Sequence, residues 1–263
     1  MTSSDPYQLL ARYYDLQNAD VTDDLPFWLE LAGHHRDPIL ELGCGTGRVL
    51  LQLAREGHAV VGVDRSEAML TRARARLDSR PELAKQIELV LQDFTDLDLS
   101  RSFDLVIMPF NTFAHLLTRS EQSAALQSVQ RHLDAGGCFA FDVPNPAEVY
   151  AAPREGLYLE RILRDEKRGS TIQVFSSFQL ERNKQRGHIT WVYDEVDDEG
   201  RLTRTTVPMT LRYSFPDELV NLLEASGFQV RTLSGAYEDV PLEEDSERMV
   251  VIAEKAPSAA PGG

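Results

Sequence analysis

Cysteine is nearly absent from this chain, which has 263 residues and two cysteines, Cys44 and Cys138. Neither belongs to a closely spaced Cys or His pair of the kind that holds zinc, so no metal site is predicted. A disulfide framework is not indicated either. Chains without such a framework are typical of reducing compartments, and we therefore expect a cytoplasmic protein.

Long hydrophobic runs are also missing. No window approaches the roughly 20 apolar residues that a helix needs to cross a bilayer. The first ten residues, MTSSDPYQLL, contain no basic residue and no long apolar run, unlike a secretory signal peptide. The sequence therefore predicts a protein without a membrane partner.

Positive charge is in deficit, with 27 Lys and Arg against 42 Asp and Glu and a formal net charge of -15. Phosphate backbones and anionic membrane surfaces both bind through an excess of cations, so no nucleic-acid partner is expected. The arginines at 72, 74, 76 and 80 are a local exception, for which a solvated helix face is the favoured interpretation. Composition leaves both a monomer and a homodimer open.

The stretch from Pro38 to Asp64 combines an apolar strand, a glycine-rich turn, a helix and a second strand. Its glycines at 43, 45 and 47 allow a sharp bend, positive φ angles and close approach of a ligand to the backbone. The pattern predicts a βαβ unit that holds a nucleotide-type ligand at its first turn.

Two residues of this unit bear on which ligand it holds. A dinucleotide-binding turn has its third glycine at the position where this chain has Arg48. Glu41 precedes the turn, and a carboxylate there would repel a pyrophosphate but suits a cationic or hydroxyl-bearing ligand. Both residues argue against a nicotinamide-dependent oxidoreductase, which the same βαβ start could otherwise support.

The segment ELGCGTG resembles motif I of the class I S-adenosylmethionine (SAM) dependent methyltransferases. The resemblance implies that SAM is the cofactor, that Glu41 positions its methionine end, and that Asp64 accepts hydrogen bonds from its ribose hydroxyls. It also places the residues of the turn along the methionine and the ribose: Gly43, Cys44, Gly45 and Gly47.

Later segments match the same family in order and spacing. The resemblance implies that Asp93 accepts a hydrogen bond from the adenine amino group, while Met69 and Phe94 pack on the ring. Arg65, which directly follows the ribose-binding position, is a further cofactor candidate. Several ordered matches indicate the family more strongly than a single glycine turn does.

The loop after the strand over 103–108 matches the family's loop beside the sulfonium and the substrate. By this resemblance Pro109 is assigned to the cofactor, and Asn111 and Phe113 to the substrate. His115 follows, and its near-neutral pKa suits proton removal from an ammonium or hydroxyl group, which makes it a catalytic candidate. A capping or packing histidine is the alternative interpretation.

The N-terminal segment YQLLARYYD resembles the helix that folds over SAM in small-molecule methyltransferases. We expect Tyr7 to contact the substrate and Tyr14 to contact the cofactor and take part in catalysis. An amphipathic helix that packs its tyrosines on the sheet remains the alternative. Loops near the same sheet edge add two substrate candidates, Asn145 and Tyr237.

The order of predicted elements indicates an α/β fold with a Rossmann-like, seven-stranded, doubly wound sheet and an antiparallel β insert. Early helices are expected over 47–56 and 66–77, and a third is expected to be capped by Ser120 and to end at the glycines of 136–137. The predicted domains are a helical lid (1–36), a SAM-binding domain (37–156 and 214–255), the insert (157–213) and a disordered tail (256–263).

Together these features predict a SAM-dependent methyltransferase that transfers the sulfonium methyl to a nitrogen or oxygen of a small-molecule acceptor. Two alternatives stay open: a nicotinamide-dependent oxidoreductase, and a SAM-binding protein without catalysis whose insert docks a partner. A pocket that reaches from the glycine turn to the insert would favour the enzyme, whereas an insert that seals this space would favour the docking protein.

Overall fold

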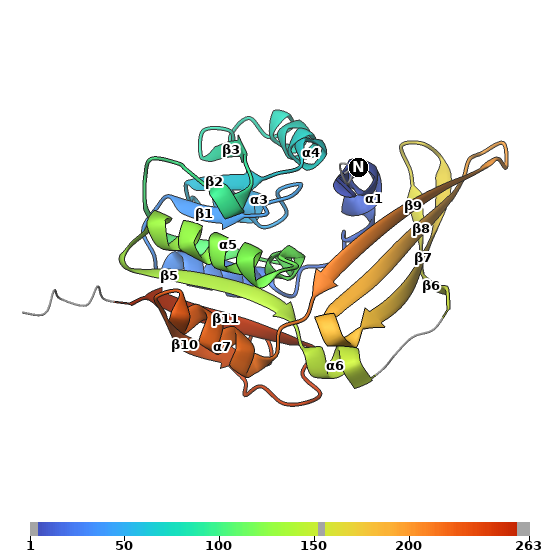
Figure 1. The fold of residues 1–263 in the computed structure, drawn as a ribbon. Helices are drawn as coiled ribbons and strands as arrows, with labels where there is room; N and C mark the ends of the chain where they lie inside the picture. Colours follow the sequence, from blue (N-terminus) through green and yellow to red (C-terminus); the bar gives the residue numbers. More distant parts are fainter. Residues whose placement is uncertain (1–4, 152–155, 257–263) are drawn as a thin grey trace, which may run out of the picture.

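The computed structural model describes residues 5–151 and 156–256. Within them one sheet has seven strands in the order β10-β11-β5-β4-β1-β2-β3, and a second sheet stands beside the α/β part (Figure 1). The strands of the first sheet are β1 (Ile39–Leu42), β2 (Val60–Asp64), β3 (Ile87–Leu91), β4 (Phe103–Met108), β5 (Leu133–Pro144), β10 (Phe228–Ser234) and β11 (Arg248–Lys255). The Rossmann-like fold with an antiparallel insert is therefore confirmed. Residues 257–263 of the predicted tail lie outside the described residues.

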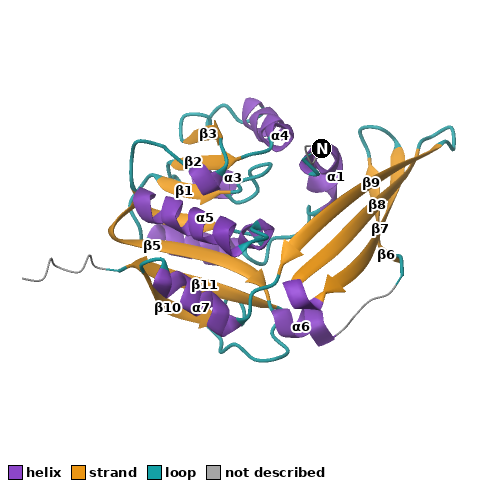
Figure 2. Ribbon diagram, in the orientation of Figure 1, coloured by secondary structure: helices purple, strands orange, loops and turns teal. Residues whose placement is uncertain are grey.

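Strand direction within the seven-stranded sheet is mixed. The five strands β1 to β5 pair in parallel, whereas β11 pairs antiparallel with both β5 and β10. Helices join these strands, as Figure 2 shows. They are α1 (Tyr7–Gln17), α2 (Leu25–Gly33), α3 (Leu50–Arg55), α4 (Glu67–Asp78), α5 (Arg119–His132), α6 (Pro146–Ala151) and α7 (Pro216–Ala225), with short 3-10 helices η1 (Phe94–Asp96), η2 (Thr112–His115) and η3 (Arg182–Lys184).

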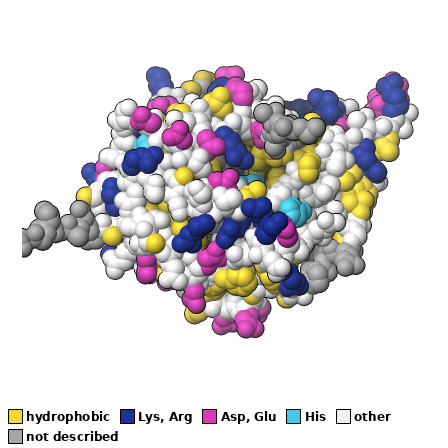
Figure 3. Space-filling view, viewed as in Figure 1, with side chains coloured by type: hydrophobic (Ala, Val, Ile, Leu, Met, Phe, Trp, Pro, Cys, Tyr) yellow, Lys and Arg dark blue, Asp and Glu magenta, His cyan; other side chains and the backbone are white. Residues whose placement is uncertain are grey.

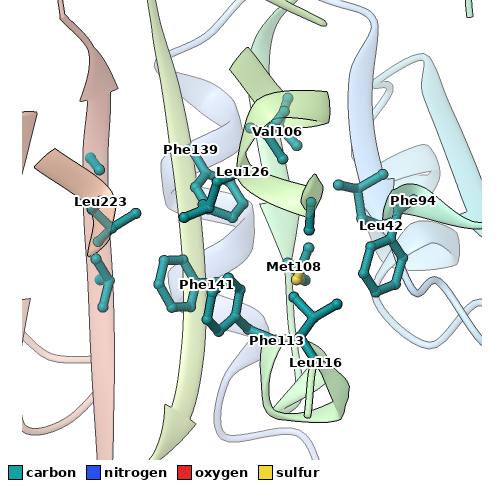
Figure 4. Packing of buried hydrophobic residues seen from close by; sticks show 14 of the residues in the cluster. Leu42, Phe94, Val106, Met108, Phe113, Leu116, Leu126, Phe139, Phe141 and Leu223 are labelled. Carbon is teal, nitrogen blue, oxygen red and sulfur yellow. The ribbon is translucent and has the colours of Figure 1, made fainter. Parts of the chain in front are cut away.

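Two apolar clusters fill the two faces of this sheet. All four residues of β1 are buried, and their side chains alternate between the faces, with Ile39 on one side and Leu40 and Leu42 on the other. Figure 4 shows the cluster on the face of Leu42, in which Phe113 stacks on Phe141 with ring centroids 4.8 Å apart. Burial on both faces explains why these strands lack a polar alternation.

Element boundaries differ from expectation around α3 and α5. Helix α3 begins at Leu50 rather than at residue 47. The N-cap of α5 is Thr118, not Ser120: its hydroxyl accepts from the Glu121 N–H while the Glu121 carboxylate accepts from the Thr118 N–H, a complete capping box. This reciprocal pair satisfies two otherwise unpaired backbone donors and fixes the helix start earlier.

The insert is a four-stranded antiparallel sheet in the order β6-β7-β8-β9. Its strands are β6 (Tyr158–Asp165), β7 (Ser170–Glu181), β8 (Arg186–Val196) and β9 (Leu202–Arg212). The sequence predicts strands over 170–180, 188–196 and 202–213. Strand β6 is an addition, because its apolar residues do not alternate cleanly with polar ones, and Leu159 and Ile162 are exposed.

Helix α1 lies between α4 and the insert sheet (Figure 1). On the insert side, Tyr13 stacks on Tyr193 with centroids 4.1 Å apart, and its hydroxyl lies 3.1 Å from the Thr205 hydroxyl. On the α/β side, Asp15 accepts a 2.6 Å hydrogen bond from Thr46. The helix thus contacts both halves of the molecule. Among the described residues, no helix is both long and apolar enough to cross a membrane.

Candidate active site

A cavity of about 420 Å³ lies between the carboxyl ends of the central strands, helix α1 and the inner face of the insert. Its walls come from distant parts of the sequence, including Gly43 and Asp64 of the first βαβ unit, Tyr7 and Tyr14 of α1, and Trp191 of β8. The insert therefore covers this space without sealing it. Figure 3 shows hydrophobic side chains in the hollow between the two halves.

The glycine turn forms the floor of the cavity. Gly43 has a φ of 69°, and a Cβ at this position would lie 2.4 Å from Cγ2 of Thr112. Gly45 has a φ of 56°, and its Cβ would lie 3.3 Å from Cε of Met69. Both positions require glycine for the backbone angle as well as for space. A ligand can therefore approach the backbone closely here.

Asp64 stands at the end of β2, beside this turn. Its Oδ2 accepts from the Gly45 N–H and its Oδ1 from the Ser66 N–H, both at 2.8 Å. Burial raises the pKa of Asp64, while these two backbone hydrogen bonds lower it. Each carboxylate oxygen has a second lone pair, so Asp64 can also accept hydrogen bonds from two hydroxyls of a ligand.

A side chamber of about 30 Å³ adjoins the cavity and shares Tyr14 and Gly43 with it. Glu41 lines this chamber at 3% exposure, and its Oε2 has no hydrogen-bond partner among the described residues. Burial raises the pKa of Glu41 to about 8. A buried acceptor without a partner is costly, and a cationic ligand group would satisfy it.

Arg48 lines the same chamber. Its two terminal nitrogens each lie 2.5 Å from an oxygen of Asp24, a bidentate ion pair in which Asp24 is buried and Arg48 is partly buried. The guanidinium packs 5.0 Å from the Phe110 ring centroid. The residue that replaces the third dinucleotide glycine therefore connects the turn to the start of α2. The charge of Arg48 is balanced by Asp24, so Glu41 is the side chain of this chamber that suits a charged group of a ligand.

His115 and Tyr7 meet inside the cavity. The Tyr7 hydroxyl and Nε2 of His115 share a 3.0 Å hydrogen bond, whose direction depends on the imidazole tautomer. Burial lowers the pKa of His115 to about 4, and the nearby charge of Arg65 acts in the same direction. The imidazole is therefore neutral at pH 7, and it can accept or donate a hydrogen bond there.

The loop that carries Phe110 and Asn111 is held by a buried carboxylate. Both residues have positive φ angles, 58° and 61°. Asp142 accepts their backbone N–H groups at 2.6 Å and 3.3 Å, and Arg248 lies 3.5 Å from its Oδ2. Burial raises the pKa of Asp142 to about 6. These hydrogen bonds stabilise a backbone that would otherwise be strained.

The insert supplies an apolar wall that sequence reasoning did not assign to the site. Ile189 and Trp191 of β8, and Met209 and Leu211 of β9, line the cavity. Each pair is two residues apart and so projects from one face of the sheet. Ile189 is the cross-strand neighbour of Met209, so the two pairs lie side by side. Alternation along β8 and β9 was visible in the sequence, but not which face would be covered.

Eight predicted site residues do not line the main cavity: Glu41 of the side chamber, the five described here, and Asn145 and Tyr237. Phe113 is packed in the core. In the 3-10 helix η2, residues three apart lie on the same side, so Thr112 and His115 both line the cavity while Phe113 lies on another side of the helix. Gly47 packs against helix side chains. Cys44 and Pro109 line only the side chamber. Asp93 lies at the start of η1, where its Oδ1 accepts from the Thr95 N–H and hydroxyl.

Asn145 and Tyr237 also lie elsewhere than expected. The Asn145 amide donates to the carbonyls of Glu243 and Ser246 at 3.1 Å and 2.9 Å, which ties down the loop before β11. The Tyr237 hydroxyl accepts from Arg248 at 2.8 Å, and its ring packs near Trp28. Both residues support the loops around the site, because strand β11 returns beside β5 and brings these partners within reach.

Comparison with known proteins agrees with this geometry. Residues 39–137 match the family model described as "Methyltransferase domain". The cypemycin N-terminal methyltransferase of Streptomyces sp is 28% identical over 217 residues, which are 82% of this chain and 82% of that protein. The structure of the CcbJ methyltransferase from Streptomyces caelestis superposes with a TM-score of 0.79 at 26% identity and covers 96% of this chain and 98% of its own.

A further solved structure, the SAM-bound amino pentose methyltransferase CalS10 from Micromonospora echinaspora, has a TM-score of 0.71 at 20% identity and covers 93% of this chain and 97% of its own. The family match spans β1 to the first part of β5, which includes the glycine turn and Asp64. The fold match extends through the insert and β11. Residues 39–137 therefore form a methyltransferase domain, and the whole chain shares the fold of SAM-dependent methyltransferases.

Proposed function

We propose that this methyltransferase methylates the nitrogen of a small, largely apolar amine. One observation carries the proposal: a single cavity joins the glycine turn and Asp64, which suit SAM, to a neutral histidine and an apolar wall on the insert. SAM supplies an electrophilic methyl group on a sulfonium. The remaining work is to hold both reactants in line and to exclude water.

The residues of the site fit SAM. Asp64 would accept hydrogen bonds from the ribose hydroxyls, and the unpaired Oε2 of Glu41 would accept from the ammonium group. Arg48 and Tyr14 line the same chamber as Glu41 and could donate hydrogen bonds to the carboxylate of SAM. Met69, Phe94 and Arg65 line the cavity beyond Asp64 and suit the adenine side.

Nitrogen is favoured over oxygen by the state of His115. An alcohol needs a base strong enough to take its proton, and an imidazole whose pKa is about 4 is a weak base. A neutral amine needs only a hydrogen-bond acceptor that orients its lone pair. The relatives agree, since one is named for an N-terminus and another for an amino pentose.

Trp191 is expected to bind the body of the acceptor. Trp191→Ala should raise the acceptor KM by about tenfold, since losing roughly 1.4 kcal/mol of apolar contact changes affinity by that factor. The affinity for SAM should be unchanged, which calorimetry would show. Ile162→Ala is the matched control, because Ile162 is an exposed insert residue outside the cavity. Equal KM values for the two variants would contradict the assignment.

Glu41 is expected to release a proton when SAM binds. Its pKa is raised to about 8 in the free protein, so the carboxyl is mostly protonated at pH 7. The ammonium of SAM favours the ionised form, and about one proton should therefore leave per SAM bound. SAM affinity should rise with pH and level off above about pH 8.

Calorimetry in two buffers of different ionisation enthalpy measures this proton count. Glu41→Gln keeps the shape of the side chain but cannot ionise, so its proton release should vanish and its SAM affinity should fall about tenfold, as expected for one charge-assisted hydrogen bond. The same proton count in both proteins would show that Glu41 is not the group that faces the ammonium.

The proposed function is tested by methyl transfer from radiolabelled SAM to matched pairs of acceptors. Each pair would carry an amine or a hydroxyl on the same cyclic, apolar scaffold. We expect label in the amines and not in the alcohols. Transfer to alcohols alone would contradict the proposal for nitrogen. SAM binding without transfer to any pair would favour the non-catalytic alternative.

A further inference from the structure

A second pocket, of about 150 Å³, lies beside the end of helix α1 and outside the main cavity. The end of α1, the segment that leads to α2, helix α3 and the end of α4 form its walls. Four arginines line it: Arg48 beside the glycine turn, Arg55 of α3, Arg76 of α4 and Arg80 just after α4. Asp15 is the carboxylate that lines it among the described residues.

Two of the four guanidinium groups are balanced by carboxylates. Arg48 forms its bidentate pair with Asp24, and Arg76 lies 3.5 Å from Asp15. Arg76 also donates to the carbonyl oxygen of Thr46 at 3.2 Å. These two arginines therefore hold the lid helix and the glycine turn in place, which departs from the solvated face expected for Arg76.

The other two guanidinium groups have only neutral acceptors. Arg55 donates to Oε1 of Gln52 at 2.9 Å. Arg80 donates to the carbonyl of Arg76 at 3.1 Å and to the hydroxyl of Ser79 at 3.2 Å. Neither charge is compensated by a carboxylate of the described residues. Two guanidinium groups without a carboxylate partner at one pocket make a local positive site in a chain of net charge -15, and such a site attracts an anion.

We propose that this pocket binds a phosphate or phosphomonoester dianion, held mainly by Arg55 and Arg80. A dianion matches the two unbalanced charges, and guanidinium groups bind phosphate oxygens through short, charge-assisted hydrogen bonds. The bound phosphate would connect α3 and the end of α4 with the segment that follows the lid. Since Arg55 and Arg80 line neither the main cavity nor the side chamber, phosphate and cofactor would bind together.

Phosphate binding is measured directly by calorimetry with inorganic phosphate at fixed ionic strength, in a chloride buffer, with and without saturating S-adenosylhomocysteine. We expect one phosphate per chain and the same affinity in both conditions. Loss of phosphate binding in the presence of S-adenosylhomocysteine would overturn the proposal, because it would place the anion in the cofactor's own carboxylate position. No binding in either condition would overturn it as well.

The double variant Arg55→Gln/Arg80→Gln should weaken phosphate binding about 100-fold, or tenfold for each charge-assisted hydrogen bond lost. Its affinity for S-adenosylhomocysteine should be unchanged, which also reports that the variant is folded. The matched control is Arg74→Gln/Arg164→Gln, which removes two exposed arginines elsewhere. An equal loss of phosphate affinity in the control would overturn the site, because the binding would then follow net charge alone.

Discussion

Asp64→Ala weakens SAM binding about 1000-fold in our account. The variant removes both oxygens that would accept the ribose hydroxyls, and two charge-assisted hydrogen bonds contribute about 4 kcal/mol together. The same change also frees the Gly45 N–H and the Ser66 N–H, which loosens the turn around the ligand. Calorimetric titration with SAM measures the effect, and a melting curve shows whether the fold is kept.

Two further variants separate the ribose contact from the turn. Asp64→Asn keeps one acceptor oxygen, so it should bind SAM more tightly than Asp64→Ala and more weakly than the unaltered protein. Asp98→Ala removes an exposed carboxylate that accepts from the Ser100 N–H in a loop outside the cavity. SAM affinity should not change in this control. An Asp64→Ala protein that is folded and binds SAM normally would contradict the assignment of the cofactor site.

His115→Gln is expected to lower kcat by about 30-fold, because a hydrogen bond to a nitrogen that gains positive charge contributes about 2 kcal/mol. Glutamine retains polar atoms but not the geometry of the imidazole acceptor beside Tyr7. SAM affinity should stay the same, because His115 would act on the acceptor. A kcat within threefold of the unaltered protein would contradict this role.

The pH profile gives an independent test of His115. Its pKa is lowered to about 4, so the group is neutral above about pH 5 and becomes charged only below that value. The rate for an amine acceptor should therefore show no inflection near pH 6.5 from His115, and any rise with pH should follow the ionisation of the amine.

Tyr7→Phe removes the hydrogen bond that holds the imidazole of His115. This variant should lower kcat about tenfold and leave the pH profile unchanged.

Local sequence patterns were sufficient to bring together the residues of the first βαβ unit that line the cavity. The glycines at 43 and 45 and Asp64 are neighbours in one βαβ unit, whose geometry is set by short-range rules. Tyr7, Tyr14 and His115 were also placed together correctly in one cavity, through resemblance to a family whose fold brings them there. Their chemical roles stay predictions.

The acceptor half depended on contacts between distant segments. Which face of β8 and β9 meets the cavity is decided by how α1 packs on the insert, and no local pattern carries that information. Phe113 was misplaced because a four-residue 3-10 helix turns its side chain away from His115, and such a short element leaves little periodicity. The sequence shows at position 48 only that the third dinucleotide glycine is replaced by arginine. It does not predict the ion pair of Arg48, because the partner Asp24 lies on the separate segment before α2.

The central claim is that this cavity binds SAM, and calorimetric titration of the purified protein with SAM, S-adenosylhomocysteine and NAD tests it most directly. We predict tight binding of the first two ligands at one site per chain, with loss of both in Asp64→Ala, and no binding of NAD. Binding of NAD alone, or of none of the three, would contradict the account.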